Sequence, residues 1–237
     1  MVRPALGERQ RFRGYLNGTH EGFAVVPRIL SNQEVDGLVR ELACVTLQRS
    51  RAGARHLLSV PAIAALARDS RLLDLAANVL GCEPLPFGAT LFDKSPAANW
   101  LVSWHQDTAL PFVERREVAG WGPWSKKAGV DYALAPAAAL VRIVALRVHI
   151  DDSTPQNGPL RVLPGTHTLG VLDEEQIGDA ARRIGPVPCT VARGGVIVVR
   201  PLLVHASSKA TVESPRRVLH LEYAGVATFD GLQLRAA

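Results

Sequence analysis

The amino-acid sequence predicts a mainly β domain with flanking α-helices, in which many short strands close into a sandwich or barrel. After Gly81, short apolar runs rich in β-branched residues follow one another, and Gly, Pro, Asn and Asp separate them. Before Gly81, apolar residues instead recur at helical spacing. The chain has 237 residues, of which 47% are hydrophobic and 21% charged. It can therefore bury a substantial core, and we expect one domain over residues 1–237.

The N-terminal part, up to about residue 81, is expected to be helical. In residues 31–45, Ser31 can cap a helix because Glu34 follows three positions later, and apolar residues then recur every three or four positions. Residues 61–80 show a similar spacing up to a stop at Gly81, which predicts one or two further helices. We expect these helices to pack against a sheet.

The strands of the core are expected within about residues 82–228. The apolar runs that predict them are residues 85–92, 101–104, 140–150, 160–163, 195–199 and 218–223. Residues 173–184 carry acids first and basic residues last, the order that favours a short helix.

Residues 111–136, rich in Gly, Trp, Lys and Ala, interrupt the strand pattern and are expected to form a long loop across one mouth of the barrel. A long loop inside a compact domain is often a functional lid. Its basic residues would either meet an anionic substrate or keep the lid solvated; they are Arg115, Arg116, Lys126 and Lys127.

Composition narrows the classes of partner. The net charge is +5, but the 27 Lys and Arg residues are scattered, so a nucleic-acid partner is not expected. A positive balance equally favours a small anionic substrate. The three cysteines are widely separated and indicate neither a disulfide framework nor a Cys-rich metal site. No signal-peptide core or membrane-length apolar run is present in the sequence, so we expect a cytoplasmic protein without a membrane partner. The oligomeric state is left open.

The segment WHQDTAL contains the first candidate site. His105 and Asp107 are two positions apart, and on an extended backbone their side chains point the same way and can reach one ion. A His-x-Asp pair arises often by chance, so a third ligand is needed. His205 is a candidate because it ends the strand-like run GGVIVVRPLLVH and small residues follow it. Two histidines and a carboxylate match the facial set of non-haem Fe(II) sites, which leaves room for a 2-oxo acid and O₂.

Arg216 follows His205 at a short interval and opens the last strand-like run, SPRRVLHLEYA. A guanidinium pairs bidentately with a carboxylate, as the far end of a chelating dicarboxylate would require. Taken alone, an arginine pair near a terminus is usually a solvated surface. The order of the four residues along the chain favours the site.

Four segments occur in order between Thr90 and Ala224: TLFDKSPAANWLVSWHQD, LRVHIDDSTPQNGPLRVLPGTH, GGVIVVRPLLVHAS and SPRRVLHLEYA. On them the sequence resembles the phytanoyl-CoA dioxygenase family of Fe(II)- and 2-oxoglutarate-dependent oxygenases. The resemblance implies a double-stranded β-helix core, which is a cupin-like jelly roll. It also implies that iron is bound by His105, Asp107 and His205.

The resemblance further implies the residues that contact 2-oxoglutarate. Arg216 matches the anchor of the distal carboxylate, Ser207 matches a hydroxyl contact, and Thr90 falls at another cosubstrate-contacting position. Arg147 stands where some members carry a tryptophan, so the chain departs from the pattern there. An arginine at this position is expected to contact 2-oxoglutarate or an acidic substrate.

Other polar residues near these motifs have less certain roles. Gln106 lies between two candidate ligands and is expected to face away from the metal, because alternate residues of a strand face opposite sides. His149 shares the strand face of Arg147, so it either faces the barrel interior or is a hydrogen-bonded core residue. His220 is expected to be structural. Lys94 either meets an anion or, as the default, is a solvated lysine.

The function that the resemblance implies is hydroxylation, or a related oxidation, of a small-molecule C–H bond with release of succinate and CO₂. Halogenating relatives lack the carboxylate ligand, and this chain keeps Asp107. Two alternatives stay open: a metal-dependent oxygenase or hydrolase that does not use 2-oxoglutarate, and a non-catalytic jelly-roll binding protein with a vestigial site. Retention of the three ligands and Arg216 argues against the second. The substrate is left open, with an anionic compound and a secondary metabolite both considered.

Overall fold

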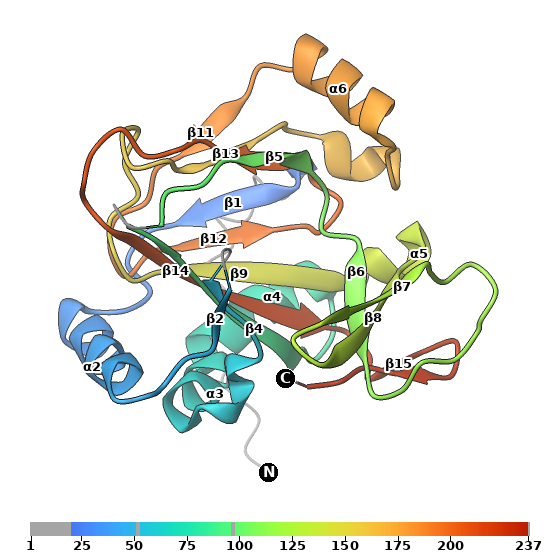
Figure 1. The fold of residues 1–237 in the computed structure, drawn as a ribbon, viewed down its shortest axis with the longest axis horizontal. Helices are drawn as coiled ribbons and strands as arrows, with labels where there is room; N and C mark the ends of the chain where they lie inside the picture. The colour runs from blue at the N-terminus through green and yellow to red at the C-terminus, as the bar shows by residue number, and fades with distance from the viewer. Residues whose placement is uncertain (1–19, 51–52, 96–97, 237) are drawn as a thin grey trace.

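The computed structural model describes residues 20–50, 53–95 and 98–236. Within these ranges, two antiparallel sheets pack face to face, as the sequence predicted (Figure 1). The larger sheet consists, in spatial order, of β1 (Phe23–Val26), β12 (Val196–Val199), β9 (Ile143–His149), β14 (Arg216–Ala224), β4 (Leu85–Lys94), β3 (Gly53–Ala54) and β2 (Arg49–Ser50). The smaller sheet consists of β11 (Val187–Cys189), β10 (Leu160–Val162), β13 (His205–Ser207) and β5 (Val102–His105).

Apolar residues from facing strands hold the two sheets together. Leu160 and Val162 on β10 pack with Ile197 and Val199 on β12, and all four are buried. β9 is buried at all of its positions, because its alternate residues face the smaller sheet on one side and the helices on the other. This is why its sequence is a continuous apolar run interrupted by polar residues that point inward.

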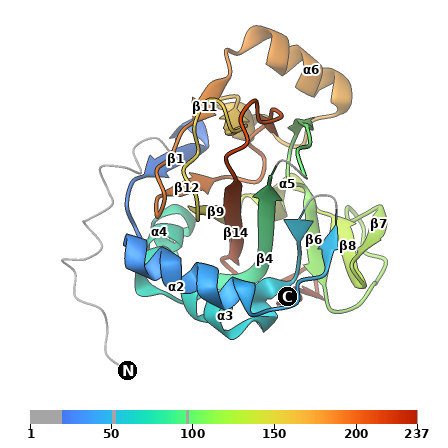
Figure 2. The same cartoon turned by 60° about the vertical axis from the view of Figure 1, so that its left-hand side comes forward.

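Helices cover the outer faces of both sheets. Helices α2 (Asn32–Ala43), α3 (Pro61–Ala67) and α4 (Ser70–Leu80) pack on the larger sheet (Figure 2). The expected capping box of Ser31 and Glu34 is present, and Gly81 ends α4 in a left-handed conformation, as predicted. Helix α6 (Glu174–Arg183) confirms the prediction for residues 173–184 and lies outside the smaller sheet. No helix within the described residues combines the length and apolar character needed to cross a membrane.

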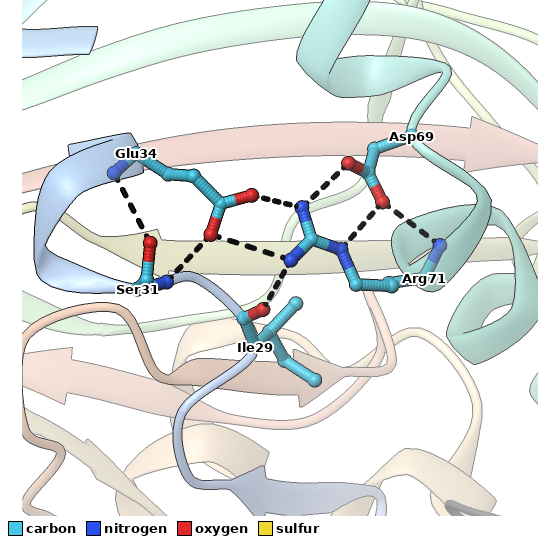
Figure 3. A network of polar contacts seen from close by, with 5 residues as sticks. All are labelled: Ile29, Ser31, Glu34, Asp69 and Arg71. Atoms are coloured by element: carbon cyan, nitrogen blue, oxygen red, sulfur yellow. Dashed lines mark hydrogen bonds and ion pairs between the residues drawn. The ribbon is translucent and has the colours of Figure 1, made fainter. Parts of the chain in front are cut away.

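A polar network ties α2 to α4 (Figure 3). Arg71 donates hydrogen bonds to Glu34 Oε1 at 2.6 Å, to Asp69 Oδ2 at 2.7 Å and to the backbone oxygen of Ile29 at 2.9 Å. Glu34 also accepts a hydrogen bond from the backbone N–H of Ser31 at 2.7 Å. The hydrogen bonds from Arg71 are the main reason that the pKa of Glu34 is lowered to about 2. The first turns of both helices are therefore fixed to the segment that leaves β1.

The N-terminal part is less purely helical than the sequence predicted. β1 precedes the helices and forms one edge of the larger sheet. β2 and β3 lie between α2 and α3 in the chain and form the other edge, and η2 (Leu57–Ser59) follows β3. Residues 1–19, which also belong to this predicted helical part, lie outside the described residues. Strands of two to four residues are too short to show a period, and they depend on pairing with other strands: β1 pairs with β12, β3 with β4, and β2 with β3.

The expected single long loop at residues 111–136 is interrupted by a third sheet, so that prediction was wrong in part; residues 113–123 do form a connection without strands. The strands of this sheet are β6 (Ala109–Phe112), β8 (Val130–Leu134) and β7 (Trp124–Lys127), in this spatial order. Phe112 is fully buried and packs edge-on against Trp121 and Trp124. Pro111 lies on an edge strand, where its missing N–H removes no ladder hydrogen bond. Pro and Gly therefore mark edges and turns here rather than an irregular loop.

The remaining short elements either pack against the third sheet or connect the strands of the two main sheets. Helix α5 (Ala137–Leu140) leads into β9, and the hairpin of β15 (Thr228–Phe229) and β16 (Leu232–Gln233) packs against β6. The short helix η3 (Thr166–Leu169) follows β10.

Candidate active site

His105, Asp107 and His205 meet on the inner side of the smaller sheet. His105 ends β5 and His205 begins β13, and the antiparallel register sets these two residues opposite each other. Asp107 Oδ1 lies 3.7 Å from His105 Nε2, and its Oδ2 lies 3.5 Å from His205 Nε2. One ligand atom from each residue lies within 4.8 Å of the others. The structure thus brings together the three residues that the sequence singled out.

The hydrogen bonds of the two rings leave both Nε2 atoms free for a metal ion. His105 Nδ1 lies 2.8 Å from the backbone oxygen of Ser103, and His205 Nδ1 lies 2.8 Å from that of Leu203. A carbonyl oxygen only accepts, so each Nδ1 carries the proton and each Nε2 presents its lone pair. Burial lowers the pKa of His205 to about 4, which keeps this ring neutral at pH 7. Two imidazole Nε2 atoms and one carboxylate fit a non-haem Fe(II) ion.

Gln106 faces away from the candidate ligands, as predicted, and anchors the turn that carries them. Its side-chain Nε2 donates to the backbone oxygens of Gly170 at 2.9 Å and Leu202 at 2.7 Å, and its Oε1 accepts from the backbone N–H of Leu172 at 2.8 Å. The next backbone N–H, that of Asp107, donates to the oxygen of Pro201 at 2.9 Å. The turn is therefore tied to the loop that leads to His205.

A pocket of about 390 Å³ opens beside these three residues. Its floor is the inner face of the larger sheet, where alternate residues of each strand point inward. The register sets His220 of β14 between Thr90 of β4 and Arg147 of β9, and sets Arg216 beside Lys94. All five residues line the pocket. Thr90, Arg147 and Arg216 were singled out from the sequence, whereas Lys94 was by default expected to be solvated and His220 to be structural.

Cations are concentrated at one end of the pocket. Lys94 Nζ donates to Ser207 Oγ at 2.7 Å and also contacts the backbone oxygen of Ser208. Arg216 donates to the same Ser207 Oγ at 3.3 Å. Lys94, Arg147 and Arg216 are 1%, 9% and 3% exposed, and no carboxylate among the described residues forms an ion pair with them. Buried cations without a counterion make this end selective for an anion.

Of the two roles considered for Lys94, the default of a solvated lysine was therefore wrong. It is the last residue of β4, and its pairing with Arg216 points it into the sandwich rather than toward water. Burial is the main cause, and the charge of Arg216 a second cause, of a lowering of the pKa of Lys94 to about 7. Burial also lowers the pKa of Arg216 to about 10, and Arg147 adds to this effect. Each of these shifts would be relieved by a bound carboxylate.

The other end of the pocket carries charges of both signs. It is lined by Glu222 on β14, Arg55 after β3, and Lys127 and Tyr132 of the third sheet. Burial, followed by the nearby Asp107, raises the pKa of Glu222 to about 7. Of the four basic residues noted at positions 115–127, only Lys127 lines this pocket; Lys126 pairs with Asp131, and the two arginines pair with exposed glutamates.

Sequence reasoning missed several of these pocket residues. Glu222 could have been found, because it shares the strand parity of Arg216 and His220. Arg55 and Lys127 carry no such signal, since they come from short segments whose place depends on long-range pairing.

A family model for phytanoyl-CoA dioxygenase matches residues 19–218. The chain belongs to the phytanoyl-CoA dioxygenase family. This family consists of Fe(II)- and 2-oxoglutarate-dependent oxygenases, so the resemblance on the four sequence segments is confirmed.

Two named relatives of this family member are enzymes. It is 28% identical over 189 residues to ectoine dioxygenase of Sphingopyxis alaskensis, covering 70% of this chain and 55% of that protein. It is 25% identical over 243 residues to L-proline trans-4-hydroxylase of Streptomyces griseoviridis, covering 86% of this chain and 82% of that protein. The match thus spans little more than half the length of the ectoine dioxygenase.

Solved structures share the fold of this phytanoyl-CoA dioxygenase family member. EctD from S. alaskensis with bound Fe superimposes with a TM-score of 0.66 at 24% identity, covering 98% of this chain and 79% of that one. HygX from Streptomyces hygroscopicus with nickel, 2-oxoglutarate and hygromycin B bound gives a TM-score of 0.65 at 19% identity, covering 90% and 86%. The mainly β fold with a jelly-roll core is therefore as the sequence predicted.

Proposed function

We propose that this protein is an Fe(II)- and 2-oxoglutarate-dependent dioxygenase that hydroxylates, or otherwise oxidises, a C–H bond of a small molecule with release of succinate and CO₂. One observation carries the proposal. A donor set that fits Fe(II) and a buried group of unpaired cations lie in the same pocket. A 2-oxo dicarboxylate needs both features, because one end chelates a metal and the other end is a free carboxylate.

His105, Asp107 and His205 would hold the iron. When bound, iron and 2-oxoglutarate together supply the activation of O₂ and the oxidising power for the C–H bond. The protein contributes two imidazole rings whose Nδ1 atoms are held by backbone oxygens, so that both Nε2 atoms face the site. The side-chain amide of the intervening Gln106 and the backbone N–H of Asp107, which both donate to backbone oxygens, hold the three metal-binding groups in place before any ligand arrives.

The far carboxylate of 2-oxoglutarate would bind Arg216, Ser207 and Lys94. Arg216 and Lys94 both donate to the Ser207 hydroxyl, so the three groups converge on one point. Arg147 and Thr90, one on either side of His220, would line the path between this point and the iron. The extra cation at Arg147 strengthens the preference of this end for an anion.

The third sheet would form the wall over the substrate side. Lys127, Tyr132 and Leu134 of this sheet line the pocket. Phe112 and Trp121 fix its other face in an apolar cluster with the C-terminal hairpin. We therefore propose a packed wall here, rather than a loose lid, that excludes water from the reacting groups.

The primary substrate is proposed to be a small molecule. The pocket is of a size for one beside the cosubstrate. The named relatives act on ectoine and on L-proline, and the HygX structure holds hygromycin B, all of which are small molecules.

The experiment is anaerobic titration of the purified protein with Fe(II) and then with 2-oxoglutarate, followed by absorbance, with succinate release measured in air. We expect one Fe(II) per chain and an absorbance change on addition of 2-oxoglutarate. Asp107→Ala and His205→Ala should lose metal binding and succinate release. Arg216→Met should keep metal binding but raise the Kd for 2-oxoglutarate by roughly tenfold or more, because a charged hydrogen bond is lost.

The exposed Arg182→Met is the matched control and should behave like the wild type in both titrations. Metal binding without any response to 2-oxoglutarate would instead favour an oxygenase or hydrolase that does not use this cosubstrate. Succinate release by Asp107→Ala at the wild-type rate would refute the ligand assignment.

A further inference from the structure

The pocket has a second polar end that the cosubstrate cannot reach. Arg216 and Glu222 lie on the same face of β14 and are six residues apart. Six residues of antiparallel strand span about 20 Å. A five-carbon dicarboxylate anchored at Arg216 is much shorter than this, so Glu222 lies on the side of the primary substrate.

Glu222 is a carboxylate without a donor. It is partly buried, and none of the described residues donates a hydrogen bond to it or forms an ion pair with it. It pairs in register with Gly88, and a Cβ atom at that position would overlap the Glu222 carboxyl group. The absence of a side chain at Gly88 therefore makes room for this acid. A carboxylate removed from water without a partner is costly, and a ligand that supplies a cationic donor recovers that cost.

Cations line the wall at the same end. Lys127 Nζ lies 4.7 Å from the centre of the Tyr132 ring, and Arg55 lines the pocket beside them. Neither cation forms an ion pair with Glu222 or with another carboxylate of the described residues, although Arg55 hydrogen-bonds to the Tyr132 hydroxyl. The acid and both bases can therefore form ion pairs with a ligand. Burial, then the charge of Arg55, lowers the pKa of Lys127, which an incoming anionic group would reverse.

We propose that the primary substrate is a small zwitterion of the amino-acid type, with its ammonium group bound by Glu222 and its acid group bound by Lys127 and Arg55. The inference rests on the proposed function, because it assumes that iron and 2-oxoglutarate fill the other end of the pocket. The proposed substrate must therefore carry both a cationic and an anionic group. A purely anionic or a neutral substrate would leave Glu222 unpaired.

The test uses the protein loaded anaerobically with Fe(II) and 2-oxoglutarate, and measures ligand binding by calorimetry. The probes are free aliphatic and cyclic amino acids, each with its N-acetyl, carboxamide and doubly capped derivative. Each set of four thus keeps one carbon skeleton and varies only charge. We expect at least one free amino acid to bind, and both singly capped forms to bind at least about tenfold more weakly.

Two variants then assign each charge to its residue. Glu222→Gln should abolish the preference for the free amino group over the N-acetyl form, while it keeps the preference for the free acid over the carboxamide. Lys127→Met should abolish the preference for the free acid over the carboxamide, while it keeps the preference for the free amino group. Because Lys127 lies on a different sheet, this variant tests the binding of the acid group even if Glu222→Gln folds poorly. Glu83→Gln removes an exposed carboxylate just before β4 and is the matched control, with both preferences unchanged.

Three outcomes would overturn the proposal: equal binding of free and capped forms, an undiminished preference for the free amino group in Glu222→Gln, or no binding by any free amino acid. Failure of the wild-type protein to bind 2-oxoglutarate would instead contradict the proposed function. The two failures are therefore distinguishable.

Discussion

At the scale of single residues, Lys94 shows how burial changes what a side chain can do. It is 1% exposed, contacts Ser207 and Ser208, and lies 5.7 Å from the centre of the Trp100 ring. Its pKa of about 7 means that its charge is lost as the pH rises through the physiological range. The same lysine on the surface would stay charged and contribute little.

This predicts a pH-dependent affinity for 2-oxoglutarate. Protonated Lys94 is the form that attracts a carboxylate, so the Kd should be nearly constant below pH 7 and rise by up to about tenfold per pH unit above it. Lys94→Met should bind more weakly at pH 6.5 and lose this dependence. Titration of the Fe(II)-loaded protein between pH 6 and 9 measures both. Lys209→Met, which removes an exposed lysine, should retain the wild-type profile; a pH dependence that persists in Lys94→Met would assign it to another group.

At the scale of elements, local signals placed the helices well and the third sheet poorly. The α2 capping box needs only Ser31 and Glu34, which are three residues apart, so it is readable from the sequence. β7 and β8 form a hairpin, but β6 joins it from a distant position through Phe112 and Asp131. No local pattern encodes that pairing, and Pro111 makes the sequence of β6 resemble that of a loop.

The network around Arg71 gives the prediction for elements. Arg71→Met should lower the free energy of unfolding by about 1–2 kcal/mol, because it removes hydrogen bonds between α2, α4 and Ile29. Glu34→Gln should cost less in the Arg71→Met background than in the wild type, with a coupling of about 0.5–1 kcal/mol after allowance for solvent screening. Urea denaturation of the double-mutant cycle measures this coupling. The exposed Glu41→Gln on the same helix should show no coupling. Additive effects of Arg71→Met and Glu34→Gln would mean that this ion pair does not link α2 to α4.

At the scale of the whole molecule, the sandwich has a polar interior, and this has a consequence for stability. His149 and His220 are 1% and 6% exposed, and burial is the main reason that the pKa of each is lowered to about 3. Neither ring nitrogen of His149 has a hydrogen-bond partner among the described residues. Two roles were predicted for His149. It faces the interior of the sandwich, as the first role requires, but it is not the hydrogen-bonded core residue of the second.

Acid should therefore destabilise the metal-free protein below pH 6.5. The unfolded chain takes up a proton at each histidine near pH 6.5, whereas the folded chain does so only near pH 3. Above pH 6.5 the two histidines do not lower the free energy of unfolding. Between pH 6.5 and pH 3 this free energy should fall by up to about 1.4 kcal/mol per pH unit for each histidine. Thermal unfolding between pH 7.5 and 5 should show a shallower slope in His149→Leu. The exposed His20→Leu should keep the wild-type slope, and the same slope in His149→Leu would show that this residue is not responsible.

The sequence by itself determined the features that depend on neighbouring residues. Alternation along an extended backbone directs His105 and Asp107 to one ion and Gln106 away from it, and the four ordered segments carry the family. The grouping of Lys94 with Arg216, and of Glu222 with Lys127, was decided only by the tertiary structure. These groupings depend on the register between strands far apart in the chain, and a register shift of one residue would turn every one of these side chains to the opposite face.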